Sequence, residues 1–346
     1  MKCKRIHLMK IDRGGETMNR VNKRINGLMV LSILLLLLTA CTSGESSSGE
    51  GEDGAVATSG EGSKELKIGL TVNNLDNPFF VSMSNAAEAH AEELGAEIIV
   101  QAADADLAKQ TSQIENFITQ GVDLILLNAV DSKGIAGAVA QADAAGIPII
   151  SVDVGADGGI EGTVTSDNYQ AGVLAAEYMI EDLGGKGNVV VIDGPPVTAV
   201  KDRIAGFEDT IEGTDINVIA KQNGEGNREK GLQVMESILQ ANKPGTIDAV
   251  FANNDPVAIG AEIAQQQAGR QDEFYIVGVD GSPDVIEAMK KEGSSIAGTS
   301  AQHPDDMIVK AMDVGIQVIE GESVEEVTKI PVDLVTQDNL SSYSGW

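Results

Sequence analysis

The sequence predicts an α/β protein built from two similar lobes, each with a parallel sheet covered by helices on both faces. Short apolar runs alternate along the chain with segments of Ala-, Glu- and Gln-rich helical composition. Continuous apolar strands that alternate with helices are typical of parallel sheets buried on both faces. The length of 346 residues exceeds one typical core and favours two domains.

The predicted strands fall into two sets of four. They are the apolar runs at 66–72, 96–102, 122–128 and 147–153, then those at 188–194, 216–222, 247–253 and 274–280. The sets resemble each other, because VDLILLNAVD at 122–131 is similar to IDAVFANND at 247–255 and IPIISVD at 147–153 is similar to FYIVGVD at 274–280. We therefore expect two lobes derived from one ancestral pattern.

Three of the helices are predicted to begin directly after a strand, each with a capping side chain followed by proline. Asn, Asp and Ser are good N-caps, and proline is favoured in the first helical position. The cap and proline pairs are Asn77 with Pro78, Asp255 with Pro256, and Ser282 with Pro283. Ligands of open α/β sheets bind beyond the carboxyl ends of the strands, so these three junctions are expected near a binding cleft.

Phe79 and Phe80 stand side by side in the first turn of the first of these helices, in a chain that is only 3% aromatic. One interpretation is a hydrophobic staple that packs into the core. The other is a pair of rings that face a ligand, and the recurrence of the strand–cap–helix junction favours it.

The N-terminus is predicted to be a targeting segment rather than part of the fold. A basic stretch from Met18 precedes an apolar run of 11 residues at 28–38, which is a length typical of a signal peptide and too short to span a bilayer. The sequence LTAC at 38–41 resembles the lipobox of bacterial lipoproteins, which implies cleavage before Cys41 and lipidation of it. The alternative is an incidental thiol. With a start at Met18, Cys3 drops out and no internal disulfide is possible.

Residues 41–65 are Gly-, Ser- and Glu-rich without periodicity, which predicts a flexible tether. Beyond the signal peptide of residues 1–40, the chain holds 16 Lys and Arg against 51 Asp and Glu, a net charge of −35. Such a surface repels phosphate backbones and argues against nucleic-acid binding.

Residues 66–346 resemble the type I periplasmic sugar-binding proteins, particularly the ribose-binding branch. The resemblance rests on the order and spacing of eight short motifs: NNLDNPFF at 73–80, SVD at 151–153, TSDN at 165–168, DRIAGF at 202–207, FANNDPVAIGA at 251–261, GVDGSPD at 278–284, TSAQHPDDM at 299–307 and IPVDL at 330–334.

The resemblance implies two Rossmann-like lobes joined by a three-strand hinge (periplasmic binding protein-like I). The crossings would fall near Asp167, Gln302 and Asp333. The N-terminal lobe would then consist of residues 66–167 and 303–333, and the C-terminal lobe of residues 168–302 and 334–346.

The resemblance also implies a set of ligand-binding residues with suitable chemistry. Sugar hydroxyls donate and accept hydrogen bonds, which suits carboxylates, amides and the fork of an arginine, while aromatic rings suit the C–H face of the sugar. The residues are Asn77, Phe79, Phe80, Asp153, Arg203, Asn254, Asp280 and Gln302. Alternatives remain, since either aspartate could cap a helix and Arg203 could form an ion pair within its lobe. Turn or cap roles suffice for Asn128 and Asp131.

Three positions depart from the ribose-binding pattern. Val154 replaces an arginine, while Gly226 and Val279 replace aromatic residues. A less cationic and larger pocket makes ribose itself doubtful and favours a hexose, a furanose or a polyol.

The sequence predicts an extracytoplasmic, lipid-anchored, monomeric solute-binding protein that delivers a sugar or polyol to an ABC permease. The alternative is a receptor that presents its closed form to a membrane sensor kinase or chemoreceptor. A repressor would need a helix-turn-helix before Leu66, where the tether stands. No cofactor, metal or enzymatic activity is predicted, because no hydrolase, metalloprotease or phosphate-binding motif occurs and the histidines are only His7, His90 and His303.

Overall fold

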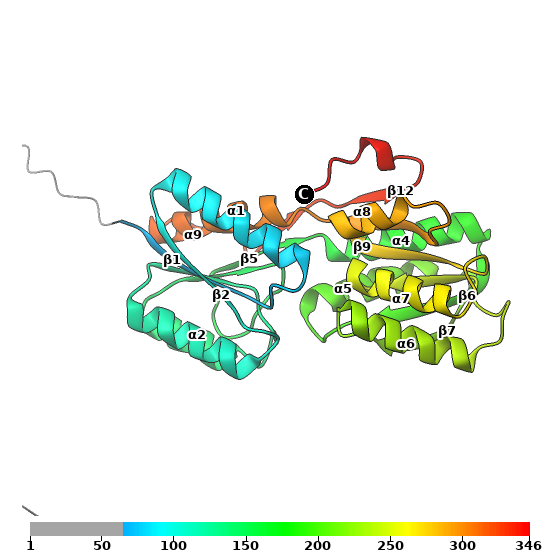
Figure 1. Cartoon of the computed structure of the whole chain (residues 1–346). Coiled ribbons are helices and arrows are strands. Elements are labelled where there is room, and N and C mark those ends of the chain that lie inside the picture. Colours follow the sequence, from blue (N-terminus) through cyan, green and yellow to red (C-terminus); the bar gives the residue numbers. More distant parts are fainter. Residues whose placement is uncertain (1–64) are drawn as a thin grey trace, which may run out of the picture. The chain divides into compact units, whose positions relative to one another are not determined.

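A computed structural model describes residues 65–346, which form two α/β lobes (Figure 1). The predicted signal peptide, Cys41 and the tether up to residue 64 lie outside the described residues. None of the helices within 65–346 is long and apolar enough to cross a membrane.

The first lobe is a six-stranded, all-parallel sheet with the strand order β2-β1-β3-β4-β5-β11. Helices α1 and α9 pack together, as do α2 and α3, and the two pairs cover opposite faces of the sheet (Figure 1). The elements are β1 (Lys67–Val72), α1 (Pro78–Leu94), β2 (Glu97–Ala102), α2 (Leu107–Gln120), β3 (Leu124–Leu127), α3 (Ala136–Ala144), β4 (Ile149–Val152), β5 (Gly162–Ser166), α9 (Pro304–Ile319) and β11 (Val327–Ile330).

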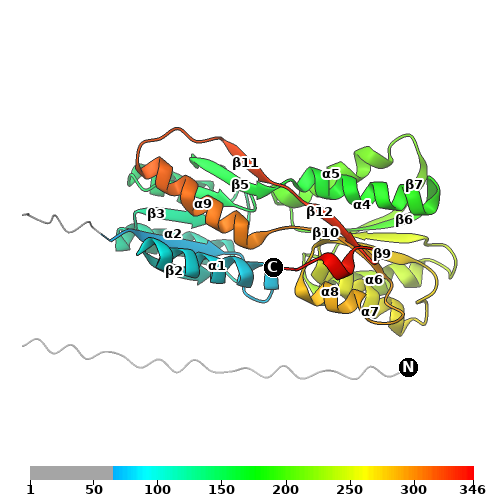
Figure 2. The same ribbon diagram turned by 90° about the horizontal axis from the view of Figure 1, so that it is seen from above.

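The second lobe repeats this order as β7-β6-β8-β9-β10-β12, with only its last strand antiparallel. Helices α4 and α5 cover one face, and α6, α7 and α8 cover the other (Figure 2). The elements are α4 (Asn168–Leu183), β6 (Lys186–Asp193), α5 (Thr198–Ile211), β7 (Asp215–Asn223), α6 (Arg228–Ala241), β8 (Ala249–Ala252), α7 (Asp255–Gln267), β9 (Tyr275–Asp280), α8 (Pro283–Met289), β10 (Ile296–Ala301), β12 (Asp333–Thr336) and a 3₁₀ turn at Leu340–Ser342.

The chain passes between the two sheets at three points: from β5 to α4, from β10 to α9, and from β11 to β12 (Figure 2). The first and third passages are hydrogen-bonded to each other, because Asp167 N donates to Ile330 O over 2.9 Å. The fold therefore has the predicted class of two parallel-sheet lobes joined by a hinge of three segments. The residue-level lobe boundaries stay a prediction.

Two of the three predicted cap and proline pairs occur as expected, and the third is shifted by one residue. The Asn77 side chain accepts from Phe79 N, and Ser282 accepts from Val285 N. The prediction that Asp255 caps α7 is wrong, because Asn254 takes that role by accepting from Val257 N. Asp255 is instead the first helical residue, and its buried carboxylate accepts from Ser282 N (2.8 Å) and Thr299 Oγ1 (2.7 Å).

Candidate functional site

A cavity of about 90 Å³ lies at the carboxyl ends of strands from both sheets, and all eight predicted ligand-binding residues line it. In both lobes the strand order changes direction beside the first strand, which is where ligands of doubly wound sheets bind. Asn77, Phe79, Phe80 and Asp153 follow strands of the first lobe. Arg203, Asn254 and Asp280 belong to the second lobe, and Gln302 lies in the passage from β10 to α9.

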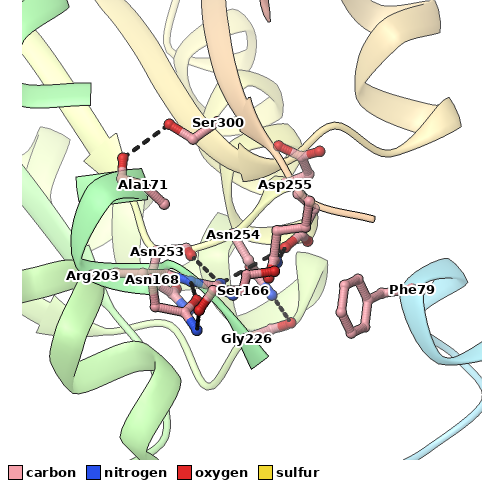
Figure 3. Close-up of polar contacts among 12 residues, drawn as sticks. Phe79, Ser166, Asn168, Ala171, Arg203, Gly226, Asn253, Asn254, Asp255 and Ser300 are labelled. Carbon is pink, nitrogen blue, oxygen red and sulfur yellow. Dashed lines mark hydrogen bonds and ion pairs between the residues drawn. The ribbon is translucent and has the colours of Figure 1, made fainter. Parts of the chain in front are cut away.

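Phe79 and Phe80 both pack into the core and face the cavity, so the staple and the ligand-facing interpretations each hold in part. Phe79 is only 3% exposed and belongs to the first lobe's core cluster, and Phe80 packs against that cluster. The rings meet edge-to-face with their centroids 5.4 Å apart. Both also line the cavity, and Figure 3 shows the Phe79 ring projecting toward the polar groups of the second lobe. The packing fixes the rings, so their cavity-facing surfaces are rigid.

Asp153 follows β4 in a strained conformation, with its carboxylate only partly satisfied. Its φ of 68° is uncommon for a residue other than glycine, and such strain gathers at functional sites. Oδ2 accepts from Asn128 Nδ2 over 3.0 Å, whereas Oδ1 is buried without a hydrogen-bond partner among residues 65–346. Burial raises the pKa of Asp153, against the opposing effects of Arg203 and Asn128. The free oxygen is a ready acceptor for a ligand donor.

Asn128 is a cavity residue that sequence reasoning set aside as a turn or cap. It follows β3, lines the cavity, and its Nδ2 holds Asp153 while its Oδ1 accepts from Asn73 N. Its position at the end of a predicted strand, equivalent to that of Asp153, was the signal that could have identified it.

Arg203 is buried and held in a fixed orientation by neutral acceptors. Its Nε donates to Asn168 Oδ1 over 2.7 Å, and its Nη1 donates to Asn253 O over 3.0 Å (Figure 3). Nη1 also lies 3.7 Å from Asp280 Oδ1. Arg203 and Asp280 therefore form the ion pair within the lobe that was the alternative interpretation of Arg203. Both residues also line the cavity.

Asp280 ends β9 at a position equivalent to that of Asp153 and also has a positive φ, of 138°. Its Oδ1 accepts from Gln302 Nε2 over 2.8 Å, while Gln302 Oε1 is buried with no partner in the described part of the chain. Burial raises the pKa of Asp280 to about 7, against the opposing effects of Arg203 and Gln302. Neither Asp153 nor Asp280 caps a helix in this structure.

Asn254 lines the cavity with most of its hydrogen-bonding capacity already used. Oδ1 caps α7, and Nδ2 donates to Gly226 O over 3.0 Å. One amide hydrogen is left for a ligand, so Asn254 chiefly shapes the wall.

Two of the three departures from the ribose-binding pattern change the cavity wall. Val154 and Gly226 line the cavity, where Val154 belongs to an apolar cluster with Val197 and Val200. Val279 does not line it, because its side chain is fully buried in the core. The inference of a larger, less cationic pocket therefore rests on Val154 and Gly226 alone.

Among residues 65–346, one group of possible metal ligands occurs, outside the cavity lining at the beginning of α9. Ligand atoms of His303, Asp305 and Asp306 lie within 4.8 Å of one another. Carboxylates in the first turn are favoured by the helix dipole, which accounts for this group without an ion.

Two lobes that face one cavity across a hinge define a periplasmic binding protein of type I. The family of periplasmic binding protein domains matches residues 68–323, and the chain belongs to this family, the type I periplasmic sugar-binding proteins.

Relatives and solved structures agree with this assignment. The chain is 36% identical to the ribose import binding protein RbsB of Bacillus subtilis over 311 residues, which cover 89% of this chain and 98% of that protein. An ABC transporter solute-binding protein from Bacillus halodurans with bound myo-inositol matches with a TM-score of 0.75 and 33% identity, over 81% of this chain and 97% of that one. The fructose-binding periplasmic domain of a hybrid two-component system also matches, with a TM-score of 0.75 and 27% identity, over 80% of this chain and 93% of that one.

Proposed function

We propose that this protein is an extracytoplasmic solute-binding protein that captures a sugar or polyol between its two lobes and delivers it to an ABC importer. The observation that carries the proposal is the pairing of unsatisfied buried acceptors, Asp153 Oδ1 and Gln302 Oε1, with two phenylalanine rings across one cavity. A polyhydroxylated ring supplies hydroxyl donors for the first and a C–H face for the second. The site residues named above are its proposed ligand contacts.

The charges around the cavity favour a neutral ligand. The cavity lining holds three carboxylates, those of Asp153, Glu225 and Asp280, and a single guanidinium, that of Arg203. The adjoining groove is lined by five carboxylates, those of Asp76, Asp104, Glu225, Glu229 and Asp284, and by one guanidinium, that of Arg228. Asp104, Glu225 and Asp284 form ion pairs with Lys109, Lys230 and Arg228, but the carboxylates still outnumber the cations. This excess disfavours a phosphorylated or carboxylated sugar, whereas hydroxyl donors are accepted by the carboxylates.

The wall formed by Val154 and Gly226 favours a ligand other than ribose. An arginine and an aromatic ring would stand there in the ribose-binding pattern, and their replacement leaves a larger space with an apolar side. A hexose, a furanose or a polyol fits this space, and the bound myo-inositol of the Bacillus halodurans protein is of that class.

A thermal-shift panel tests the proposal. The compounds are D-ribose, D-fructose, D-allose and myo-inositol, with D-ribose 5-phosphate as the charged control. A compound at about 100 times its dissociation constant adds roughly 2.7 kcal/mol to the free energy of unfolding. We expect at least one neutral compound to raise the melting temperature and the phosphate to leave it unchanged. A shift produced only by the phosphate, or by none of the compounds while another metabolite class succeeds, would refute the carbohydrate assignment.

Lipid anchoring of Cys41 is part of the proposal and rests on the lipobox-like LTAC sequence. Cys41→Ser should abolish cleavage at that site or move the protein out of the membrane fraction, as seen by fractionation and mass spectrometry. A mutant that is processed and membrane-bound like the wild type would contradict the anchor. The control is Ser43→Ala, which keeps the cysteine.

A receptor that signals to a membrane kinase is the second candidate function. The match to the periplasmic domain of a hybrid two-component system favours keeping it. Co-purification after crosslinking in intact cells separates the two, because an ABC permease supports transport and a sensor kinase or chemoreceptor supports signalling.

A further inference from the structure

The segment that follows β12 returns to the turn after β9 and donates two hydrogen bonds to it. Tyr343 Oη donates to Gly281 O over 3.0 Å, and Trp346 Nε1 donates to Asp280 O over 3.0 Å. In Figures 1 and 2 this segment, drawn in red, extends from β12 toward α1 of the first lobe. It thus reaches a proposed ligand-binding residue from outside the cavity.

The turn that receives these bonds needs support, because two consecutive residues have positive φ. Asp280 has φ 138° and Gly281 has φ 74°. The main chain there is also held by Gln302 N, which donates to Asp280 O over 2.8 Å, and by Thr299 Oγ1, which accepts from Gly281 N over 3.1 Å. Trp346 and Tyr343 add two further constraints to a conformation that is disfavoured for aspartate.

Trp346 also contacts the opposite lobe. Its ring meets that of Phe79 edge-to-face, with centroids 6.0 Å apart and an interplanar angle of 90°, and it packs against the first lobe's core cluster. One side chain therefore joins a ring of the first lobe to the main chain of Asp280 in the second, although it does not itself line the cavity.

We propose that Trp346 is a positioning residue that sets the Asp280 turn and the Phe79 ring relative to each other and stabilises the closed arrangement of the lobes. Its consequence for ligand affinity rests on the proposed function. Affinity falls in proportion to the fraction of molecules in the binding-competent arrangement, so loss of this contact weakens binding without removing any ligand contact.

A ligand-free experiment tests the positioning itself, using hydrogen exchange on the purified full-length protein. We expect Trp346→Ala to speed exchange in both 275–289 and 73–83, which belong to different lobes. Trp346→Phe keeps a ring against Phe79 and loses the N–H, and Tyr343→Phe loses only the bond to Gly281, so both should speed exchange in 275–289 and leave 73–83 near the wild type. Tyr169→Phe, at an exposed ring on α4, is the control. Exchange altered only within 337–346 would overturn the proposal.

A binding experiment then tests the functional consequence. Trp346 is the only tryptophan in the sequence, so its emission reports directly on this contact. With whichever of myo-inositol, D-ribose or D-fructose shifts the wild-type melt, saturation should reduce acrylamide quenching of Trp346. Trp346→Ala should bind that compound roughly tenfold more weakly, equal to 1.4 kcal/mol, with circular dichroism unchanged. Unchanged affinity would overturn the functional part. If none of the three binds the wild type, the carbohydrate assignment fails while the exchange data still decide the positioning role.

Discussion

At the scale of single residues, the cavity places two carboxylates where ionisation is costly. Asp153 and Asp280 are buried, both have positive φ, and burial raises the pKa of each. Arg203 opposes the rise but is shared by both and is itself hydrogen-bonded to neutral acceptors. Two buried carboxylates beside one guanidinium lower the stability of the unliganded protein, but they provide acceptors for the hydroxyl groups of a neutral polyol.

Asp280→Asn should therefore raise the melting temperature of the unliganded protein at pH 8. The pKa of Asp280 is about 7 in the folded protein, against an ordinary value of 3.8, so between these pH values the folded state binds more protons than the unfolded state. Stability consequently falls as pH rises from about 4 to 7, and it stays lower above that range. Asparagine keeps the oxygen that accepts from Gln302 Nε2 and removes the charge. Because folded Asp280 is already neutral near pH 4, the increase in melting temperature should vanish there.

Melting curves from pH 4 to 8 check this, with the exposed Asp76→Asn as the control. The ligand-induced shift should be lost in Asp280→Asn at pH 8, since a charged acceptor is worth about 1.5–3 kcal/mol. A variant that melts lower than the wild type at pH 8 and equally at pH 4 would show that the charge stabilises the fold.

At the scale of elements, helix packing determines where Arg203 stands. Helices α4 and α5 approach closely through two glycines, because a Cβ at Gly172 would lie 1.9 Å from Arg203 O and one at Gly206 would lie 2.1 Å from Tyr169 O. The α5 main chain at Arg203 is thus in direct contact with α4, whose first residue, Asn168, accepts from Arg203 Nε. The position of the guanidinium is a property of this helix pair.

Gly172→Ala should destabilise the protein and weaken ligand binding together. The added methyl must push α5 away, and overpacking of this kind costs about 1–3 kcal/mol. The matched control is Gly137→Ala on α3, where a Cβ meets nothing within 4 Å and alanine should raise stability by up to about 1 kcal/mol. Denaturant melts and ligand titrations of both variants check this. Equal behaviour of the two variants would contradict the close packing.

The sequence predicted eight strands that the structure contains, but not the other four of the two sheets. β5, β10, β11 and β12 are short or rich in Thr, Ser and Gly, so they lack the continuous apolar run on which the strand prediction relied. They lie on the hinge side of each sheet, where strands leave one lobe for the other.

The sequence likewise predicted part of the candidate site and missed the rest. The junctions after strands and the family resemblance predicted eight residues that line one cavity. The positive φ at Asp153 and Asp280, the bond from Asn128 and the contact of Trp346 depend on residues that tertiary folding brings together. No local pattern in the sequence indicates these features. Asn254 and Asp255 are both good N-cap residues, so the sequence does not show which of them caps α7.

At the scale of the whole described molecule, contacts across the cavity join the lobes. Gly155 N in the first lobe donates to Thr198 Oγ1 at the beginning of α5 over 2.9 Å. Val154 and Val197 belong to one apolar cluster, and Trp346 meets Phe79. These contacts and the ligand contacts depend on the same closed arrangement. The proposed ligand and the lobe–lobe contacts therefore stabilise one state jointly.

Ligand binding should make the protein more compact. A ligand shifts an open–closed equilibrium only by its differential affinity for the two states, and here the proposed contacts divide between the lobes. We expect the radius of gyration from small-angle scattering to fall when a compound that raises the melting temperature is added at saturation. Arg203→Lys keeps the charge but loses the planar fork that reaches Asn168 and Asn253, so the same compaction should require a much higher ligand concentration. The control is Lys201→Arg, at an exposed position of the same helix, which should compact at the same ligand concentration as the wild type. If the wild type binds the compound with no change in its radius of gyration, closure about the three passages is not how this protein responds to its ligand.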